Sequence, residues 1–193
     1  YTVMFCSTEN NDEKATNLLY MLRHRQMDGF IIIPTPGLKK EVQLLVSEQK
    51  PVVLVDRYFP DLETSYVTVD NFKGATGGVE LLIKKGYKNI GLITLDSMQV
   101  QMMERERGYN VTLEKSNING GAEMILRIPY DMNYGNTVKA ISDFLQKEKD
   151  IDGLFFTTNY LGVAGLESIR ALGKKIPGEI GIVCFDDSDL FRL

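Results

Sequence analysis

Short apolar runs alternate with amphipathic segments along the whole chain, and this alternation limits the possible folds more than any other feature. Residues 51–55 form one such run, and residues 72–85 carry Val79, Leu82 and Ile83 on one helical stripe. Strands separated by helices of about 10–15 residues indicate βαβ units with a parallel sheet and right-handed crossovers. The sequence therefore predicts an α/β fold.

The pattern restarts once, near residues 86–90, and so predicts two similar lobes, 1–88 and 89–193, each a parallel sheet flanked by helices. We expect strands at 1–6, 29–33, 51–55, 66–69, 89–95, 124–128, 153–158 and 180–185. We expect helices after the polar loop 7–12, at 38–48, 72–85, across 102–109, and at 134–146 and 161–172. Asn71 is expected to cap the helix 72–85, with Gly86 and Gly173 as helix ends.

Composition excludes several functions for this segment. The net charge is -4, whereas a phosphate backbone requires a basic face. No apolar run approaches the ~18 residues of a membrane span, and no signal peptide opens the chain. Cys6 and Cys184 lie in apolar runs, which favours buried thiols over a disulfide and suits a reducing cytoplasm. With His24 as the sole histidine, the sequence predicts no metal, no cofactor and no catalytic triad.

A polar residue follows nearly every predicted strand. These residues are Ser7, Asp56, Arg57, Asp70, Asp96, Asn159 and Asp186. In open α/β sheets, ligands bind beyond the carboxyl ends of the strands, so the pattern indicates a binding cleft. For Asp186 and its neighbour Asp187, a helix-capping or solvated role remains an alternative. The glycines at 74, 77 and 78 do not match G-x-G-x-x-G, so close helix–sheet packing is favoured over a dinucleotide site.

An ordered set of short motifs resembles a known family. The set runs from Met27-Asp28-Gly29 through Val52-Val53-Leu54-Val55-Asp56-Arg57 and Asp70-Asn71 to Arg105-x-x-Gly108-Tyr109, Asn159 and Phe185-Asp186-Asp187. It resembles the effector-binding core of lactose-repressor/galactose-repressor family transcription regulators. The resemblance implies a two-lobed, periplasmic-binding-protein-like core of type I that closes on a small molecule, usually a sugar.

The resemblance also implies roles for individual residues. By match, Arg105 and Asp186 contact effector, together with Asn159, Asp70 and Asn71. Asp96 and Ser97 follow a strand at the same edge and are further candidate ligand-binding residues. Family members often have Asp where this chain has Tyr160. We expect the chain to be a fragment without the helix-turn-helix headpiece, the hinge helix, the first strand and helix of the core, and the final crossover.

Three functions remain to be compared. The first is the sugar-sensing part of a cytoplasmic, homodimeric regulator, a repressor-type protein that binds operator DNA through an N-terminal helix-turn-helix absent from this chain. The second is an exported sugar-binding protein of an uptake transporter, and the motifs around Arg105 and Asp186 favour the regulator. The third, an enzyme, is disfavoured because the sequence offers no nucleophile elbow and no phosphate loop.

Overall fold

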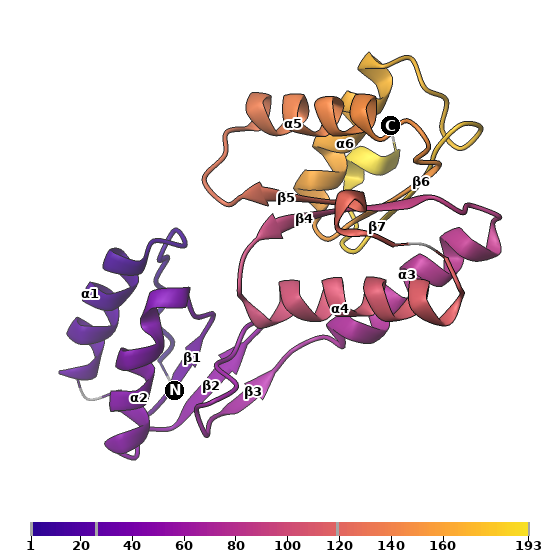
Figure 1. The fold of residues 1–193 in the computed structure, drawn as a ribbon. Helices are drawn as coiled ribbons and strands as arrows, with labels where there is room; N and C mark the ends of the chain where they lie inside the picture. Colours follow the sequence, from indigo (N-terminus) through magenta and orange to yellow (C-terminus); the bar gives the residue numbers. More distant parts are fainter. Residues whose placement is uncertain (1, 26, 119, 193) are drawn as a thin grey trace. The chain divides into compact units, whose positions relative to one another are not determined.

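The computed structural model describes residues 2–25, 27–118 and 120–192 and divides the chain into two compact units, Tyr1–Val69 and Asp70–Leu193. Each unit is an α/β structure built on a parallel sheet (Figure 1). The predicted α/β class with parallel sheets is confirmed. Among the residues that the structure describes, no helix is both long enough and apolar enough to cross a membrane.

The first unit contains a three-stranded sheet in the order β1-β2-β3. Its elements are α1 (Asp12–Arg23), β1 (Phe30–Ile32), the 3-10 turn η1 (Pro36–Leu38), α2 (Lys39–Ser47), β2 (Val52–Val55) and β3 (Ser65–Val67). Ala15 and Leu19 of α1 pack with Val42 and Leu45 of α2 against Leu54. Both helices therefore cover one face of this sheet.

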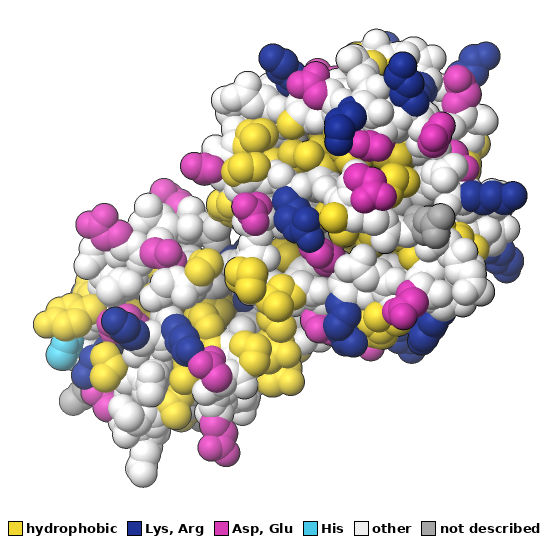
Figure 2. Space-filling model, in the orientation of Figure 1, with side chains coloured by type: hydrophobic (Ala, Val, Ile, Leu, Met, Phe, Trp, Pro, Cys, Tyr) yellow, Lys and Arg dark blue, Asp and Glu magenta, His cyan; other side chains and the backbone are white. Residues whose placement is uncertain are grey.

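The opening segment is not the core strand that its sequence predicted. Residues 2–7 form no strand, and the Phe5 side chain is 93% exposed. No strand in the described part of the first unit pairs with this segment, because β1 pairs only with β2. Cys6 is accordingly an exposed free thiol, although the sequence predicted a buried one. Figure 2 shows hydrophobic side chains at the surface over β3, where Tyr66 and Val67 are exposed.

The second unit contains a four-stranded sheet in the order β5-β4-β6-β7, all parallel. Its elements are α3 (Asn71–Lys84), β4 (Ile90–Asp96), α4 (Val100–Lys115), η2 (Ala122–Met124), β5 (Ile125–Pro129), α5 (Tyr134–Lys147), β6 (Gly153–Phe156), α6 (Asn159–Ala171), β7 (Gly181–Cys184) and η3 (Asp189–Arg192). Helices α5 and α6 lie on one face of this sheet, and α3 and α4 lie on the other (Figure 1).

Helix α3 belongs to the second unit, so the division falls at 69/70 and not at the expected 88/89. The reason is packing: Ala75, Val79 and Leu82 form one buried cluster with Leu92 of β4 and Tyr109 of α4. The alternation of strand and helix could not reveal this, because it does not say which sheet a connecting helix covers. The two helix ends predicted from glycine are confirmed, since Gly86 and Gly173 have φ values of 96° and 70°.

Helices α3 and α4 approach each other closely at Gly108. A Cβ atom built on Gly108 would lie 2.7 Å from the Phe72 carbonyl oxygen and 2.8 Å from the Ala75 Cβ. Only glycine fits a contact this close between two backbones. Because Gly108 lies one turn after Arg105, the same close approach brings Arg105 to the start of α3.

Candidate functional site

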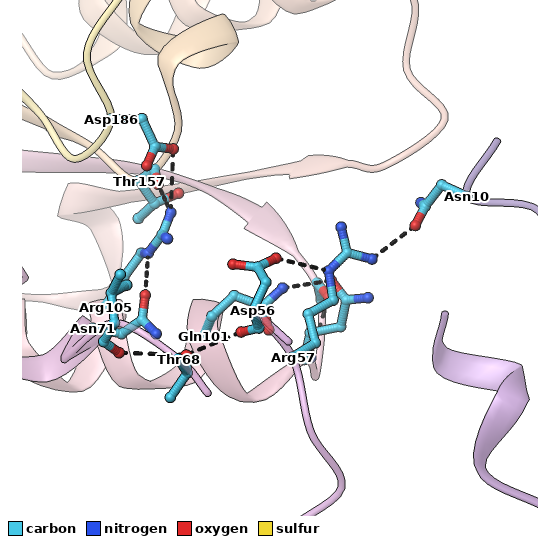
Figure 3. Close-up of polar contacts among 12 residues, drawn as sticks. Asn10, Asp56, Arg57, Thr68, Asn71, Gln101, Arg105, Thr157 and Asp186 are labelled. Carbon is cyan, nitrogen blue, oxygen red and sulfur yellow. Dashed lines mark hydrogen bonds and ion pairs between the residues drawn. The ribbon is translucent and has the colours of Figure 1, made fainter. Parts of the chain in front are cut away.

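Arg105 lies at the centre of the candidate site in the second unit, and its side chain is 5% exposed. Its Nε donates a hydrogen bond to Asn71 Oδ1 at 2.8 Å, and its Nη1 donates to the Thr157 carbonyl oxygen at 2.5 Å (Figure 3). The guanidinium carbon also lies 3.6 Å from the centre of the Phe185 ring. Contacts from three different segments thus hold this cation in one orientation.

Phe185 owes its position to a glycine in α3. A Cβ atom on Gly74 would lie 2.7 Å from the Phe185 ring, and one on Gly78 would lie 3.0 Å from Val183. The predicted role in close helix–sheet packing is confirmed for Gly74 and Gly78. It is wrong for Gly77, which is exposed and where an added Cβ would meet nothing within 4 Å. The contact of a guanidinium with an aromatic face is favourable, contributing about 2 kcal/mol or more where both groups are desolvated.

Asp186 follows Phe185 and places a carboxylate beside Arg105. The distance from Arg105 Nη1 to Asp186 Oδ2 is 3.6 Å, and the Asp186 side chain is 43% exposed. This separation is longer than the 2.7–2.9 Å of a charge-assisted hydrogen bond. The pair is therefore an ion pair between one buried and one accessible group, and the carboxylate oxygens can accept hydrogen bonds from a ligand. Because the Arg105 side chain is buried, this pair is not a bridge between two surface groups.

The N-cap of α3 lies one residue earlier than the sequence predicted. Asp70, and not Asn71, is the N-cap of α3, because its Oδ1 accepts from the Lys73 backbone N–H at 2.9 Å. Asn71 is the first helical residue, and it is buried against Arg105. Asp70 thus caps the helix with its carboxylate, and the next residue, Asn71, accepts a hydrogen bond from Arg105.

The other predicted residues lie at the carboxyl edge of the same sheet. Asp96 is exposed at the end of β4, and the Ser97 hydroxyl accepts from the Gln99 backbone N–H at 3.2 Å. Asn159 is half-buried at the start of α6, where its Oδ1 accepts from the Tyr160 backbone N–H at 2.8 Å. The parallel strand order β5-β4-β6-β7 places these three residues along the edge that also carries Asp186.

Cys184 lies directly beneath this edge and is part of its electrostatic environment. Its Sγ donates to the Thr158 carbonyl oxygen at 3.2 Å. Burial, with a smaller contribution from the nearby Asp186 carboxylate, raises the pKa of the Cys184 thiol to about 11. The thiol is therefore protonated and unreactive at neutral pH.

The first unit has its own polar group at strand ends. Arg57 Nη1 donates to Asn10 Oδ1 at 2.7 Å, and Arg57 Nε lies 3.4 Å from Asp56 Oδ2. Asp56 has a φ of 65°, a left-handed conformation that bulkier residues avoid. The third predicted residue here, Ser7, accepts from the Glu9 backbone N–H at 3.4 Å.

Two residues that contact Arg105 in the second unit, Phe185 and Thr157, were not among the predicted site residues. Phe185 was assigned to a buried strand, and Thr157 acts through its main-chain carbonyl oxygen, which no side-chain pattern reveals. The available signal for Phe185 was its place between a strand and two carboxylates, at the sheet edge where ligands bind.

The fold and this site define a class of protein: a periplasmic-binding-protein-like core whose strands present polar groups at their carboxyl edges. The family model of the periplasmic binding protein-like domain matches residues 79–193, and the chain belongs to that family. The predicted resemblance to the effector-binding core of lactose-repressor/galactose-repressor regulators is also confirmed.

The relatives agree with this assignment. The regulator KdgR of Bacillus subtilis is 26% identical over 196 residues, covering all of this chain and 57% of KdgR. The structure of CcpA of Lactococcus lactis superposes with a TM-score of 0.85 at 24% identity, covering 98% of this chain and 69% of that one. The structure of a CelR–cellobiose complex has a TM-score of 0.77 at 26% identity, covering 91% and 54%. The chain spans about half the length of the curated relatives that it matches.

Proposed function

We propose that the chain is the effector-sensing part of a transcription regulator and that its effector is a carbohydrate. The observation that carries the proposal is the buried, oriented Arg105 beside the accessible carboxylate of Asp186. A guanidinium donates to ring and hydroxyl oxygens from a rigid fork, and a carboxylate accepts from neighbouring hydroxyl groups. Asn159 adds an amide that both donates and accepts. This donor and acceptor set suits a ligand rich in hydroxyl groups.

The proposed regulator has partners that lie outside this chain. Its relatives carry the names of helix-turn-helix transcriptional regulators and not of enzymes, and one of them was solved with cellobiose. We infer operator binding through such a segment, a homodimer that matches paired half-sites, and a cytoplasmic location. Effector alters DNA affinity only as far as it binds two arrangements of the protein differently. KdgR and CelR are named as transcriptional regulators, which favours the regulator over the exported sugar-binding alternative.

Acidic and basic side chains are interspersed on the face shown in Figure 2, in keeping with a net charge of -4. Such a surface provides no basic stripe for DNA on that face. DNA contact therefore belongs to another segment of the regulator. A sedimentation measurement on the full-length protein at micromolar concentration tests the dimer, and a monomer there would contradict it.

A thermal-shift screen tests the carbohydrate proposal directly. Neutral mono- and disaccharides, cellobiose included, are added to the protein, and a ligand at 100 times its Kd stabilises the folded state by about 2.7 kcal/mol. Sugars also stabilise proteins weakly by exclusion from the surface, so the Arg105→Ala variant is the matched control. A rise in Tm for the wild type that exceeds the rise for Arg105→Ala is the expected result. Equal shifts in both proteins for every sugar would contradict the proposal.

A further inference from the structure

Asn71 contacts the candidate site through Arg105. The Asn71 residue is 6% exposed, and its Oδ1 accepts the hydrogen bond from Arg105 Nε at 2.8 Å. Its amide oxygen already accepts from a cation, and a side chain this buried offers a ligand little accessible surface. The side chain is therefore built to hold Arg105.

The bond to Nε has a particular geometric effect on the guanidinium. The group is planar, so fixing Nε and Nη1 together fixes the plane and its rotation about the side-chain axis. Asn71 fixes the first of these atoms, and the Thr157 carbonyl fixes the second. The Phe185 ring, 3.6 Å from the guanidinium carbon, sets the plane from one face. Without Asn71, the hydrogen bond that restrains Nε is lost.

We propose that Asn71 is a positioning residue, which orients Arg105 for the effector without contacting the effector itself. This proposal rests on the proposed function in so far as Arg105 is the group that binds the effector. The orientation of the arginine, however, is a property of the protein alone and can be measured without any ligand. Gly108 supports the same arrangement, because only a residue without Cβ lets α4 approach α3 at this point.

The ligand-independent test is the Nε–H resonance of Arg105 in an ¹H–¹⁵N spectrum, assigned by its absence from Arg105→Lys. A bonded, buried Nε–H exchanges slowly with water, so the wild type should show a persistent signal at neutral pH. Asn71→Ala should lose that signal, and Asn71→Asp should keep it because an acceptor oxygen remains. Asn133→Ala is the matched control: it removes an asparagine that accepts from a backbone N–H at 3.0 Å elsewhere in the unit. A persistent signal in folded Asn71→Ala would overturn the proposal.

The ligand-dependent test is a double-mutant cycle with cellobiose as the probe. Asn71→Ala should weaken binding about tenfold in the wild-type background and by less than about twofold in the Arg105→Lys background. Asn71→Asp should bind cellobiose nearly as well as the wild type. An equal loss in both backgrounds would mean that Asn71 contacts the sugar directly, contrary to the proposal. If no variant binds cellobiose, the choice of sugar fails, while the Nε–H signal still decides the role of Asn71.

Discussion

Replacing Gly108 by alanine should destabilise the second unit, although alanine is the better helix former. The added Cβ would lie 2.7 Å from the Phe72 carbonyl oxygen and 2.8 Å from the Ala75 Cβ. Both of these atoms belong to α3, so no side-chain rotation can relieve the overlap. The helices must move apart, and the bond from Arg105 to Asn71 must lengthen with them.

The change in the free energy of unfolding for Gly108→Ala is the balance of two opposing effects. Glycine to alanine inside a helix gains about 0.8–1.0 kcal/mol. Overpacking against a fixed neighbour costs typically 1–3 kcal/mol, and a clash with backbone belongs at about the upper end of that range. The net change for Gly108→Ala is therefore a loss of about 2 kcal/mol. Gly77 provides the matched control, because it is an exposed residue of α3 where an added Cβ would meet nothing within 4 Å. Gly77→Ala should gain about 1 kcal/mol.

Urea denaturation of the three proteins measures both effects. Gly108→Ala should lose about 2 kcal/mol and Gly77→Ala should gain about 1 kcal/mol, so their free energies of unfolding should differ by about 3 kcal/mol. Their m values should be unchanged. The Nε–H signal of Arg105 should also weaken in Gly108→Ala and persist in Gly77→Ala. If the two variants agree within about 0.5 kcal/mol, the helices can separate without cost and the packing argument is wrong.

Four further predictions concern the stability of the second unit, its pH dependence and DNA binding. Tyr109→Phe should lose about 1 kcal/mol in urea denaturation, because the buried hydroxyl donates to the Ile90 carbonyl at 2.7 Å. Asp152→Ala should lose about 2 kcal/mol in the same assay, because its carboxylate accepts from two backbone N–H groups of the α3–β4 loop. Burial raises the pKa of Cys184 to about 11, so its stabilising contribution is intact below the ordinary thiol value of about 8.5 and is lost as pH rises toward 11. The wild type should thus lose more stability over that range than Cys184→Ala; parallel pH profiles would contradict this. Residues 1–193 alone should not shift duplex DNA in a sequence-specific, salt-sensitive manner.

The order and type of the elements could be predicted because each strand and helix carries its own periodicity. The stripe at Val79 and Leu82 and the stops at Gly86 and Gly173 are local signals, and the structure confirms them. The strand predicted for the opening apolar run was wrong, and the reason is non-local. Apolar residues favour a strand only where a neighbouring strand can pair with them, and none does so among the described residues of that unit.

The candidate site could be predicted in part. Arg105 and Asp186 were found from the resemblance, and the structure brings them within 3.6 Å of each other. The roles of Asp70 and Asn71 could not be separated in advance, because cap and first helical residue differ by one position and by the direction of one side chain. The carbonyl of Thr157 could not be found at all, since the main chain is the same at every residue.

Calorimetric titration of the best sugar from the thermal-shift screen into the wild type, Arg105→Ala and Asp186→Ala tests the central claim most directly. Charged hydrogen bonds contribute roughly 1.5–3 kcal/mol each, so Asp186→Ala should raise the Kd about ten- to a hundredfold. Asp186→Asn should do less damage, because an oxygen that accepts remains. Circular dichroism first establishes that each variant is folded. An unchanged Kd in folded Arg105→Ala and Asp186→Ala would place the effector elsewhere and contradict the account.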